Sequence, residues 1–264
     1  MFAEALHLWL WALLFALVLM ALVWAVAVRI GNAGIVDIAW ATGFAPVVLF
    51  YALAGNGAPA RRVLMAAMVM LWSLRLGIYL FWRVSAHHPH EDRRYARLRA
   101  QWGRQVNRRM FGFFQLQALL LAVLSLPWLL VCMNPAPQLQ PIELAAAGLW
   151  LLALGGESLA DGELKRFKAD PARRSGVCQI GLWRYSRHPN YFFEWLVWVA
   201  YWVFALGSPW GWVSLYCPAL MLYFLLRVTG IPLTEELSLQ SKGAQYAAYQ
   251  RRTSAFVPWF PRRD

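Results

Sequence analysis

The chain has 264 residues, of which 60% are hydrophobic and only 14% are charged, and it contains 16 tryptophans. Soluble globular proteins carry about 25% charged residues, so this composition excludes a soluble globular fold. The formal net charge of +12 is not accompanied by a soluble basic domain. We therefore expect no nucleic-acid partner and attribute the charge to membrane topology and to attraction for anionic lipid headgroups.

Apolar runs that can cross a bilayer, which takes roughly 20 residues, recur along the whole sequence. We predict seven spans, at about 7–28, 34–54, 63–84, 111–132, 141–158, 191–207 and 211–228. The first run is too long for the apolar region of a signal peptide and no basic segment precedes it, so we expect no cleavable leader. The sequence predicts an all-α polytopic protein, a bundle of about seven transmembrane helices that forms a single membrane domain.

The positions of the basic residues predict the orientation of these spans. Most of the 25 lysines and arginines fall at or beyond the same ends of the spans, mainly in segments 85–110, 159–190 and the C-terminal tail. Arg61 and Arg62 are exceptions between the second and third spans, and Arg75 lies within the third. The positive-inside rule therefore predicts an external N-terminus and a cytoplasmic C-terminus.

Three longer polar segments occur on the predicted cytoplasmic side. In segment 85–110, Tyr95, Leu98 and Trp102 have helical spacing, which indicates an amphipathic helix along the interface. This helix could simply anchor the protein to headgroups, or it could help to cover a cofactor site with its arginines.

The second segment, 157–190, begins as a continuation of the fifth span and is expected to end at Asp170-Pro171. The Gly155-Gly156 pair directly before this segment could loosen the helix. In the third segment, 229–264, Thr234 could cap a helix N-terminus. Trp259 and Phe260 at the end of the chain are expected to rest at the interface.

Four ionisable residues fall inside the predicted spans: Asp37, Arg75, Glu157 and Glu194. A charge in hydrocarbon costs from about 2.5 kcal/mol upward, so such residues face a partner or a polar cavity. All four lie on the predicted cytoplasmic half. They could form structural ion pairs, for instance Asp37 with Arg75, or line a polar cavity that opens to the cytoplasm.

The motifs exclude several kinds of chemistry. His87, His88 and His90 lie in a proline-containing loop, Cys132, Cys178 and Cys217 are widely separated, and we expect no metal site. No P-loop, nucleophile elbow or GxGxxG pattern occurs. The segment GLWRYSRHPNYFFEW instead places arginines, tyrosines, Asn190 and Glu194 at the mouth of a span. Arginine and lysine suit phosphates, and asparagine with carboxylates suits ribose and amide groups. A nucleotide-type cofactor fits this inventory.

This segment, the preceding SLADGELKRFK and the closing YxxYQRRTSAFVPWFP resemble an uncharacterised bacterial membrane family (DUF1295-like) related to steroid 5-alpha reductases. IVDIAWATGF and LRLGIYLFWR…EDRRYARLR extend the resemblance to the front half. Steroid 5-alpha reductases are seven-helix membrane enzymes that use NADPH to reduce an enone double bond. The resemblance implies an NADPH-dependent reductase in the bacterial inner membrane, with a lipophilic substrate that enters from the bilayer.

The resemblance also implies a division of roles, with a substrate-side half at 1–132 and a cofactor-binding half at 133–264. Matching its motifs to this chain gives a set of expected cofactor contacts: Asp161, Lys165, Lys168, Tyr185, Arg187, His188, Asn190, Tyr191, Glu194, Tyr246, Tyr249 and Arg251. The steroid enzymes polarise the substrate carbonyl with a Glu and a Tyr that have no clear counterpart here. We take Asp37, held protonated by apolar surroundings, and Tyr95, with Tyr79 as a second phenol, as the catalytic candidates. Glu157 stands where those enzymes carry an Asn, which leaves prenyl, polyketide or other lipid enones as substrates alongside steroids.

A second family shares part of the pattern. RHPNY, the pair Glu235-Glu236 and the later YxxY are also similar to isoprenylcysteine carboxyl and phospholipid methyltransferases. That resemblance implies S-adenosylmethionine bound by His188, Glu235 and Glu236. The longer match of the front half and of the Asp161 helix favours the reductase. A non-enzymatic lipid-binding or transport protein is the third alternative.

Overall fold

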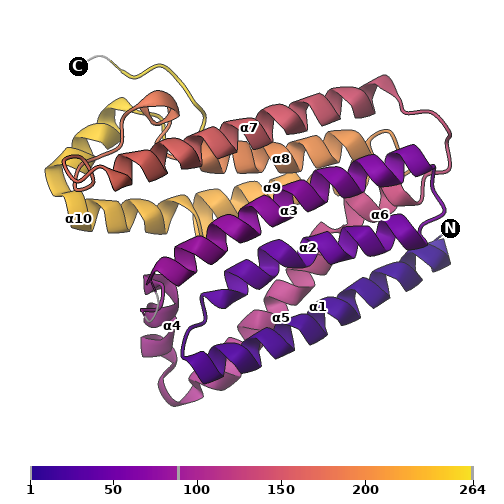
Figure 1. The fold of residues 1–264 in the computed structure, drawn as a ribbon, viewed down its shortest axis with the longest axis horizontal. Helices are drawn as coiled ribbons and strands as arrows, with labels where there is room; N and C mark the ends of the chain where they lie inside the picture. Colours follow the sequence, from indigo (N-terminus) through magenta and orange to yellow (C-terminus); the bar gives the residue numbers. More distant parts are fainter. Residues whose placement is uncertain (1, 88–89, 263–264) are drawn as a thin grey trace. The chain divides into compact units, whose positions relative to one another are not determined.

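The computed structural model describes residues 2–87 and 90–262, and every regular element in those residues is a helix (Figure 1). The predicted all-α class is confirmed. Of the histidine-rich loop, His88 and Pro89 lie outside the described residues, as do Arg263 and Asp264 at the end of the chain.

Within the described residues, six helical stretches are long and apolar enough to cross a membrane. They are Phe2–Ile30, Ile35–Ala54, Pro59–Ala86, Arg93–Cys132, Pro141–Ala169 and Gly211–Arg252. Helix α8 (Pro189–Ala205) has 17 residues, at the lower end of the range for a span, and corresponds to the predicted sixth crossing. These lengths are those of a multi-pass membrane protein.

The chain divides into two compact units. Unit 1 comprises Met1–Gln140 with Gly207–Gly211, and unit 2 comprises Pro141–Leu206 with Trp212–Asp264. The predicted halves at 1–132 and 133–264 were defined by role and not by compactness. The roles assigned to the two halves stay predictions.

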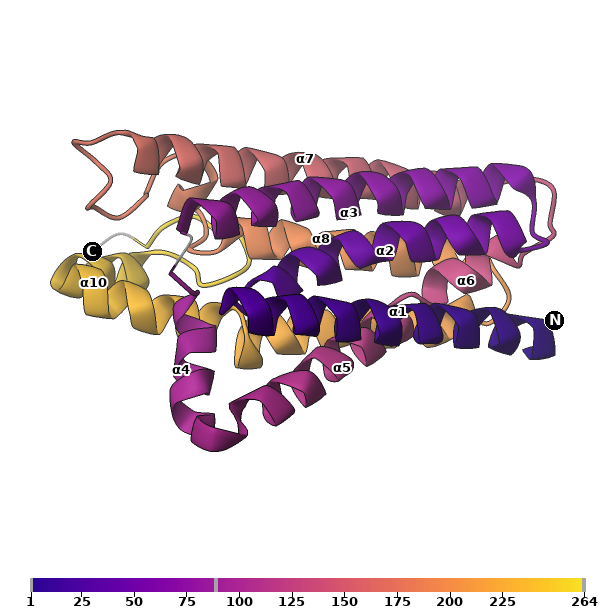
Figure 2. The same cartoon turned by 60° about the horizontal axis from the view of Figure 1, so that its bottom comes forward.

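Unit 1 contains α1 (Phe2–Ile30), α2 (Ile35–Ala54), α3 (Pro59–His87), α4 (Arg93–Trp102), η1 (Gly103–Gln105), α5 (Val106–Leu124) and α6 (Leu126–Cys132). Helix α2 packs along α3, and α1 packs along α5. In the core, the Phe44 ring centroid lies 5.5 Å from that of Trp72 and 5.2 Å from that of Trp128. Helices α4 and α5 meet in a sharp bend (Figure 2), where Gly103 adopts a positive φ of 48° that favours glycine.

Unit 2 contains α7 (Pro141–Ala169), η2 (Gly181–Arg184), α8, all of η3 (Gly211–Leu215) except its first residue, α9 (Tyr216–Tyr223), η4 (Phe224–Val228) and α10 (Ile231–Arg252). Helices α7 and α8 lie side by side along most of their length. Helix α7 runs without a break from the predicted fifth span to Ala169, directly before Asp170-Pro171. The predicted continuation and its end are therefore confirmed.

Two predicted spans are not single helices. The fourth is interrupted at Ser125, because Pro127 in the first turn of α6 has no N–H to continue the α5 ladder. The last one passes from the 3₁₀ turn η3 through α9 into η4, a π-helical turn. Neither interruption has a strong hydropathy signal, so apolar length alone could not reveal it.

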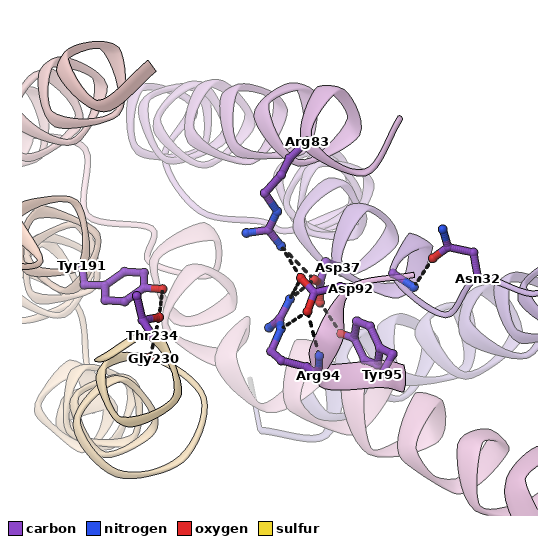
Figure 3. Close-up of polar contacts among 10 residues, drawn as sticks. Asn32, Asp37, Arg83, Asp92, Arg94, Tyr95, Tyr191, Gly230 and Thr234 are labelled. Atoms are coloured by element: carbon purple, nitrogen blue, oxygen red, sulfur yellow. Dashed lines mark hydrogen bonds and ion pairs between the residues drawn. The ribbon is translucent and has the colours of Figure 1, made fainter. Parts of the chain in front are cut away.

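The prediction that Thr234 caps a helix is wrong. Helix α10 begins at Ile231, with Gly230 at the capping position and Pro232 in the first turn. Thr234 lies inside the helix, where its hydroxyl donates to the Gly230 carbonyl oxygen at 2.9 Å (Figure 3). The proline, which is favourable at a helix start, sets the beginning of this helix.

The Gly155-Gly156 pair does not loosen α7 and instead serves its packing against α8. A Cβ on Gly156 would lie 2.5 Å from ring atoms of Phe193, whereas a Cβ on Gly155 would meet nothing within 4 Å. The missing side chain at Gly156 therefore allows the Phe193 ring to approach the α7 backbone.

These two adjacent glycines provide a matched test of the α7–α8 contact. We expect Gly156→Ala to destabilise the protein by about 1–2 kcal/mol, because the new methyl group overpacks a filled contact. Gly155→Ala should be neutral or stabilising by up to about 1 kcal/mol through helix propensity. Thermal unfolding in detergent measures both, and equal shifts for the two variants would contradict this account of Gly156.

Candidate functional site

The segment that contains RYSRHPNY is held in unit 2 by the C-terminal part of the chain. The backbone N–H of Arg187 donates to Ser254 O at 2.8 Å, and the hydroxyl of Ser186 donates to Phe256 O at 2.8 Å. Farther along, the Trp259 N–H donates to Tyr185 O at 2.9 Å. The RYSRHPNY motif and the C-terminal SAFVPWFP motif, which both carry the resemblance, are therefore hydrogen-bonded to each other.

Arg187 forms the centre of a buried polar network. Its side chain is 10% exposed, and its Nε donates to Glu235 Oε1 at 2.6 Å. Nη1 donates to the carbonyl oxygens of Gln250 and Thr253 at 2.9 and 2.6 Å. Gln250 Nε2 completes the network with a bond to Glu235 Oε2 at 2.9 Å. Much of the Arg187 guanidinium is thus engaged inside the unit, so its geometry is that of a residue that positions α10 against the start of α8.

His188 occupies the capping position of α8 next to this network. Its Nε2 lies 3.2 Å from Glu235 Oε1, and its ring stacks on Tyr191 with centroids 5.4 Å apart. Burial lowers the pKa of His188 below its ordinary value, although the hydrogen bond and charge of Glu235 oppose the shift. A neutral imidazole with its proton on Nε2 can donate to Glu235 and leave Nδ1 as an acceptor.

The two helices α7 and α8 bring Asp161 and Asn190 together. Asn190 Nδ2 donates to Asp161 Oδ1 at 3.2 Å, although the residues are 29 positions apart in the sequence. Glu157, one turn before Asp161, is 3% exposed, whereas Lys165 and Lys168 farther along α7 are exposed. This helix pair therefore carries carboxylate and amide groups next to a cationic end of α7.

The other predicted cofactor residues have mixed surroundings. Glu194 is 9% exposed and accepts a hydrogen bond from Trp198 Nε1 at 3.1 Å. Tyr246 and Tyr249 are buried, and the Tyr249 hydroxyl contacts the backbone carbonyls of Trp183 and Ser186. Tyr249 thus holds the η2 turn in place, a structural role.

Arg251 and Tyr185 lie close to the C-terminal loop. Arg251 is exposed and lines a pocket of about 480 Å³. Tyr185 packs edge-on against Phe260, and Phe260 is one of the residues that line this pocket. The lining residues are Arg187, Gln250, Arg251, Arg252, Thr253, Ser254, Ala255, Val257, Trp259, Phe260 and Arg262. The sequence pattern nominated only Arg187 and Arg251 among them. The arginine- and aromatic-rich composition of the tail was the only hint of the other lining residues. The sequence pattern does not show that the tail folds back on itself.

In unit 1, the two catalytic candidates meet although they are 58 positions apart. The Tyr95 hydroxyl donates to Asp37 Oδ1 at 2.6 Å (Figure 3). Asp37 Oδ2 accepts from Arg94 at 2.7 Å and from Arg83 at 3.3 Å. The ion pair predicted for Asp37 thus exists with Arg83 and Arg94, and not with Arg75. All three side chains donate to Asp37, which is the acceptor in each contact.

The same cluster attaches α4, the predicted amphipathic helix, to the start of α2. Asp92 caps α4 by accepting from the Arg94 N–H at 2.9 Å. Burial raises the pKa of Asp92, but hydrogen bonds and charge from Arg94 and the charge of Arg83 outweigh burial and lower it overall. Glu91 accepts from the Ala33 N–H at 2.6 Å and from Arg99 Nε at 2.7 Å. The sequence analysis did not predict these hydrogen bonds of Glu91 and Asp92. The EDRR stretch shows only that acidic and basic residues are adjacent there.

In comparisons with known proteins, the family model described as "Protein of unknown function (DUF1295)" matches residues 23–253. The uncharacterized protein C594.04c of Schizosaccharomyces pombe is 28% identical over 285 residues, which cover 96% of this chain and 79% of the yeast protein. No solved structure matches the chain significantly. Because this relative is a yeast protein, the predicted bacterial inner membrane stays a prediction. The family model covers well over half of the chain, and the protein therefore belongs to the DUF1295 family, whose function is unknown.

Proposed function

We propose that the protein is a membrane-embedded reductase that uses NADPH to reduce an enone-type carbon–carbon double bond in a lipophilic substrate. The observation that carries the proposal is the hydrogen bond between Asn190 and Asp161. The resemblance to steroid 5-alpha reductases nominated both residues independently as cofactor contacts, and the fold brings them together on α7 and α8.

The side chains of unit 2 fit the functional groups of NADPH. Asp161 can accept from ribose hydroxyls, and Asn190 can both donate and accept. The exposed Lys165 and Lys168 supply cations for phosphates one and two turns beyond Asp161. The stacked His188–Tyr191 pair, with a neutral imidazole, offers aromatic surface. The positive-inside rule would place this polar end of unit 2 in the cytoplasm, where the cofactor is found.

When bound, NADPH would supply the hydride, and the protein's contribution is orientation, electrostatics and exclusion of water. In this proposal Asp161 and Asn190 orient the cofactor, and the Arg187–Glu235 pair keeps the start of α8 in place. On the substrate side, Asp37 acts through Tyr95: the carboxylate positions the phenol, and when substrate binds the phenol O–H exchanges its hydrogen bond to Asp37 for one to the substrate carbonyl, which it then polarises. The substrate enters from the bilayer, as its lipophilic character requires.

Ligand-dependent thermal unfolding of the purified full chain in detergent tests the proposal. We expect NADPH to raise the Tm, since a ligand at about 100 times its Kd stabilises the folded state by roughly 2.7 kcal/mol. Asn190→Ala and Asp161→Asn should each raise the Kd for NADPH about tenfold, because each loses a hydrogen bond worth roughly 1–1.5 kcal/mol.

Ser158→Ala is the matched control. It removes an exposed hydroxyl from α7 that donates to its own helix at Leu154 O, so the Kd for NADPH should not change. Stabilisation by S-adenosylmethionine alone would replace the reductase with the methyltransferase. No stabilisation by either compound would favour a non-enzymatic protein, and unchanged affinity in both site variants would show that the Asp161–Asn190 pair is structural.

A further inference from the structure

The C-terminal loop of unit 2 closes on itself. The backbone N–H of Arg262 donates to Arg252 O at 2.8 Å, so residues 252–262 form a loop whose two ends are hydrogen-bonded. Compact loops of this length with adjoining ends are frequently functional. The pocket of about 480 Å³ described above is lined by this loop together with Arg187 and the last turn of α10, and its volume is in the range of small-molecule sites.

The charge of the lining points to an anionic ligand. The described residues that line the pocket include four arginines and no acid. Arg187 is paired with Glu235, whereas Arg251 and Arg262 are exposed cations on the two sides of the loop closure. The lining thus combines several cationic side chains with no carboxylate among its described residues, which favours an anionic ligand. The planar fork of guanidinium matches a phosphate group with two parallel hydrogen bonds.

The rim of the pocket adds an apolar component. Val257, Trp259 and Phe260 line it and are 52%, 69% and 76% exposed. Large exposed aromatic residues beside arginines are typical of the membrane–water interface. A ligand that joins a phosphate to an apolar or aromatic body would therefore contact both parts of the lining.

We propose that this loop pocket is a binding site for a phosphate ester. Two molecules carry that chemistry at this place: an anionic phospholipid, whose chains would lie along the exposed aromatics, and a nucleotide, whose base would stack on them. The inference rests on the side chains of the loop. Its nucleotide outcome also rests on the proposed function, because Arg251 is one of the expected cofactor contacts, whereas its lipid outcome does not.

The test uses the full chain in detergent, with dioctanoyl-phosphatidylglycerol and NADPH as two separate probes and dioctanoyl-phosphatidylcholine as the zwitterionic control. Thermal unfolding gives the Kd of each. The variant Arg251→Gln/Arg262→Gln should raise the Kd for the bound probe at least tenfold, because it loses two charge-assisted contacts. Since both side chains are exposed, its Tm without a probe should match that of the unmodified protein.

Arg173→Gln/Arg174→Gln is the matched control, since it removes two exposed arginines of unit 2 outside the pocket. It should bind both probes unchanged. If the pocket variant weakens the binding of phosphatidylglycerol but not of NADPH, the pocket is a lipid headgroup site. If it weakens the binding of NADPH, the pocket is a nucleotide phosphate site. The proposal is wrong if neither probe binds better than phosphatidylcholine, or if the pocket variant binds both as before. NADPH binding that depends on Asn190 but not on Arg251, together with phosphatidylglycerol binding that the pocket variant leaves unchanged, would overturn this inference while supporting the reductase.

Discussion

Replacing Glu235 by glutamine is expected to lower the Tm of the protein by roughly 6–12 °C, which corresponds to about 3 kcal/mol. The substitution keeps the shape of the side chain but removes the negative charge that faces Arg187. The two side chains are 16% and 10% exposed, so water cannot readily replace the lost partner. His188 would also lose the anion at its Nε2. The measurement is thermal unfolding in detergent, followed by tryptophan fluorescence.

The neighbouring carboxylate is a matched control. Glu236 is exposed and accepts from Gln240 on the next turn of α10 at 3.3 Å. Glu236→Gln should change the stability by less than about 0.5 kcal/mol, as expected for a surface position. The two residues are adjacent and chemically identical, but Glu235 is less exposed and contacts Arg187, His188 and Gln250. Equal Tm shifts would refute the assigned role of the Arg187–Glu235 pair.

Asp37→Asn should destabilise unit 1 by about 2 kcal/mol. The carboxylate, 19% exposed, is the common acceptor for Arg83, Arg94 and Tyr95. We expect a smaller effect than at Glu235 because Arg83 and Arg94 are 38% and 28% exposed and can turn toward solvent. Thermal unfolding measures the loss of stability, and limited proteolysis in the α4–α5 region should show earlier cleavage as α4 is released.

A surface ion pair and a double-mutant cycle provide the controls for Asp37. Asp170 and Arg173 form an ion pair at 3.2 Å with 39% and 63% exposure, so Asp170→Asn should cost less than about 0.5 kcal/mol. The cycle between Asp37→Asn and Arg94→Gln should give a coupling energy of at least roughly 0.5 kcal/mol, as contacting residues do. Additive effects in the cycle would mean that the pair does not attach α4.

Most residues of the candidate site could be nominated from sequence motifs, but the residues that each of them contacts could not. Asp161 and Asn190 were nominated from separate motifs, and so were Asp37 and Tyr95, and the fold joins each pair. Arg187 and Tyr249 are two of the expected cofactor contacts, and the fold shows that each also bonds to backbone carbonyl oxygens of its own unit. A motif shows which residue types occur together, whereas only the fold shows whether their polar atoms are still available.

The sequence by itself determined the membrane character, the helical class, the positions of most helices and the end of α7, since these depend on apolar length and proline, both of which are local. Tertiary structure decided which arginines pair with Asp37 and why Gly156 is a glycine. It also decided which residues of α10 contact Arg187 and that residues 252–262 close into a loop that lines a pocket. These features arise from contacts between segments far apart in the chain. Such contacts depend on how the whole chain folds, which a local sequence pattern does not show.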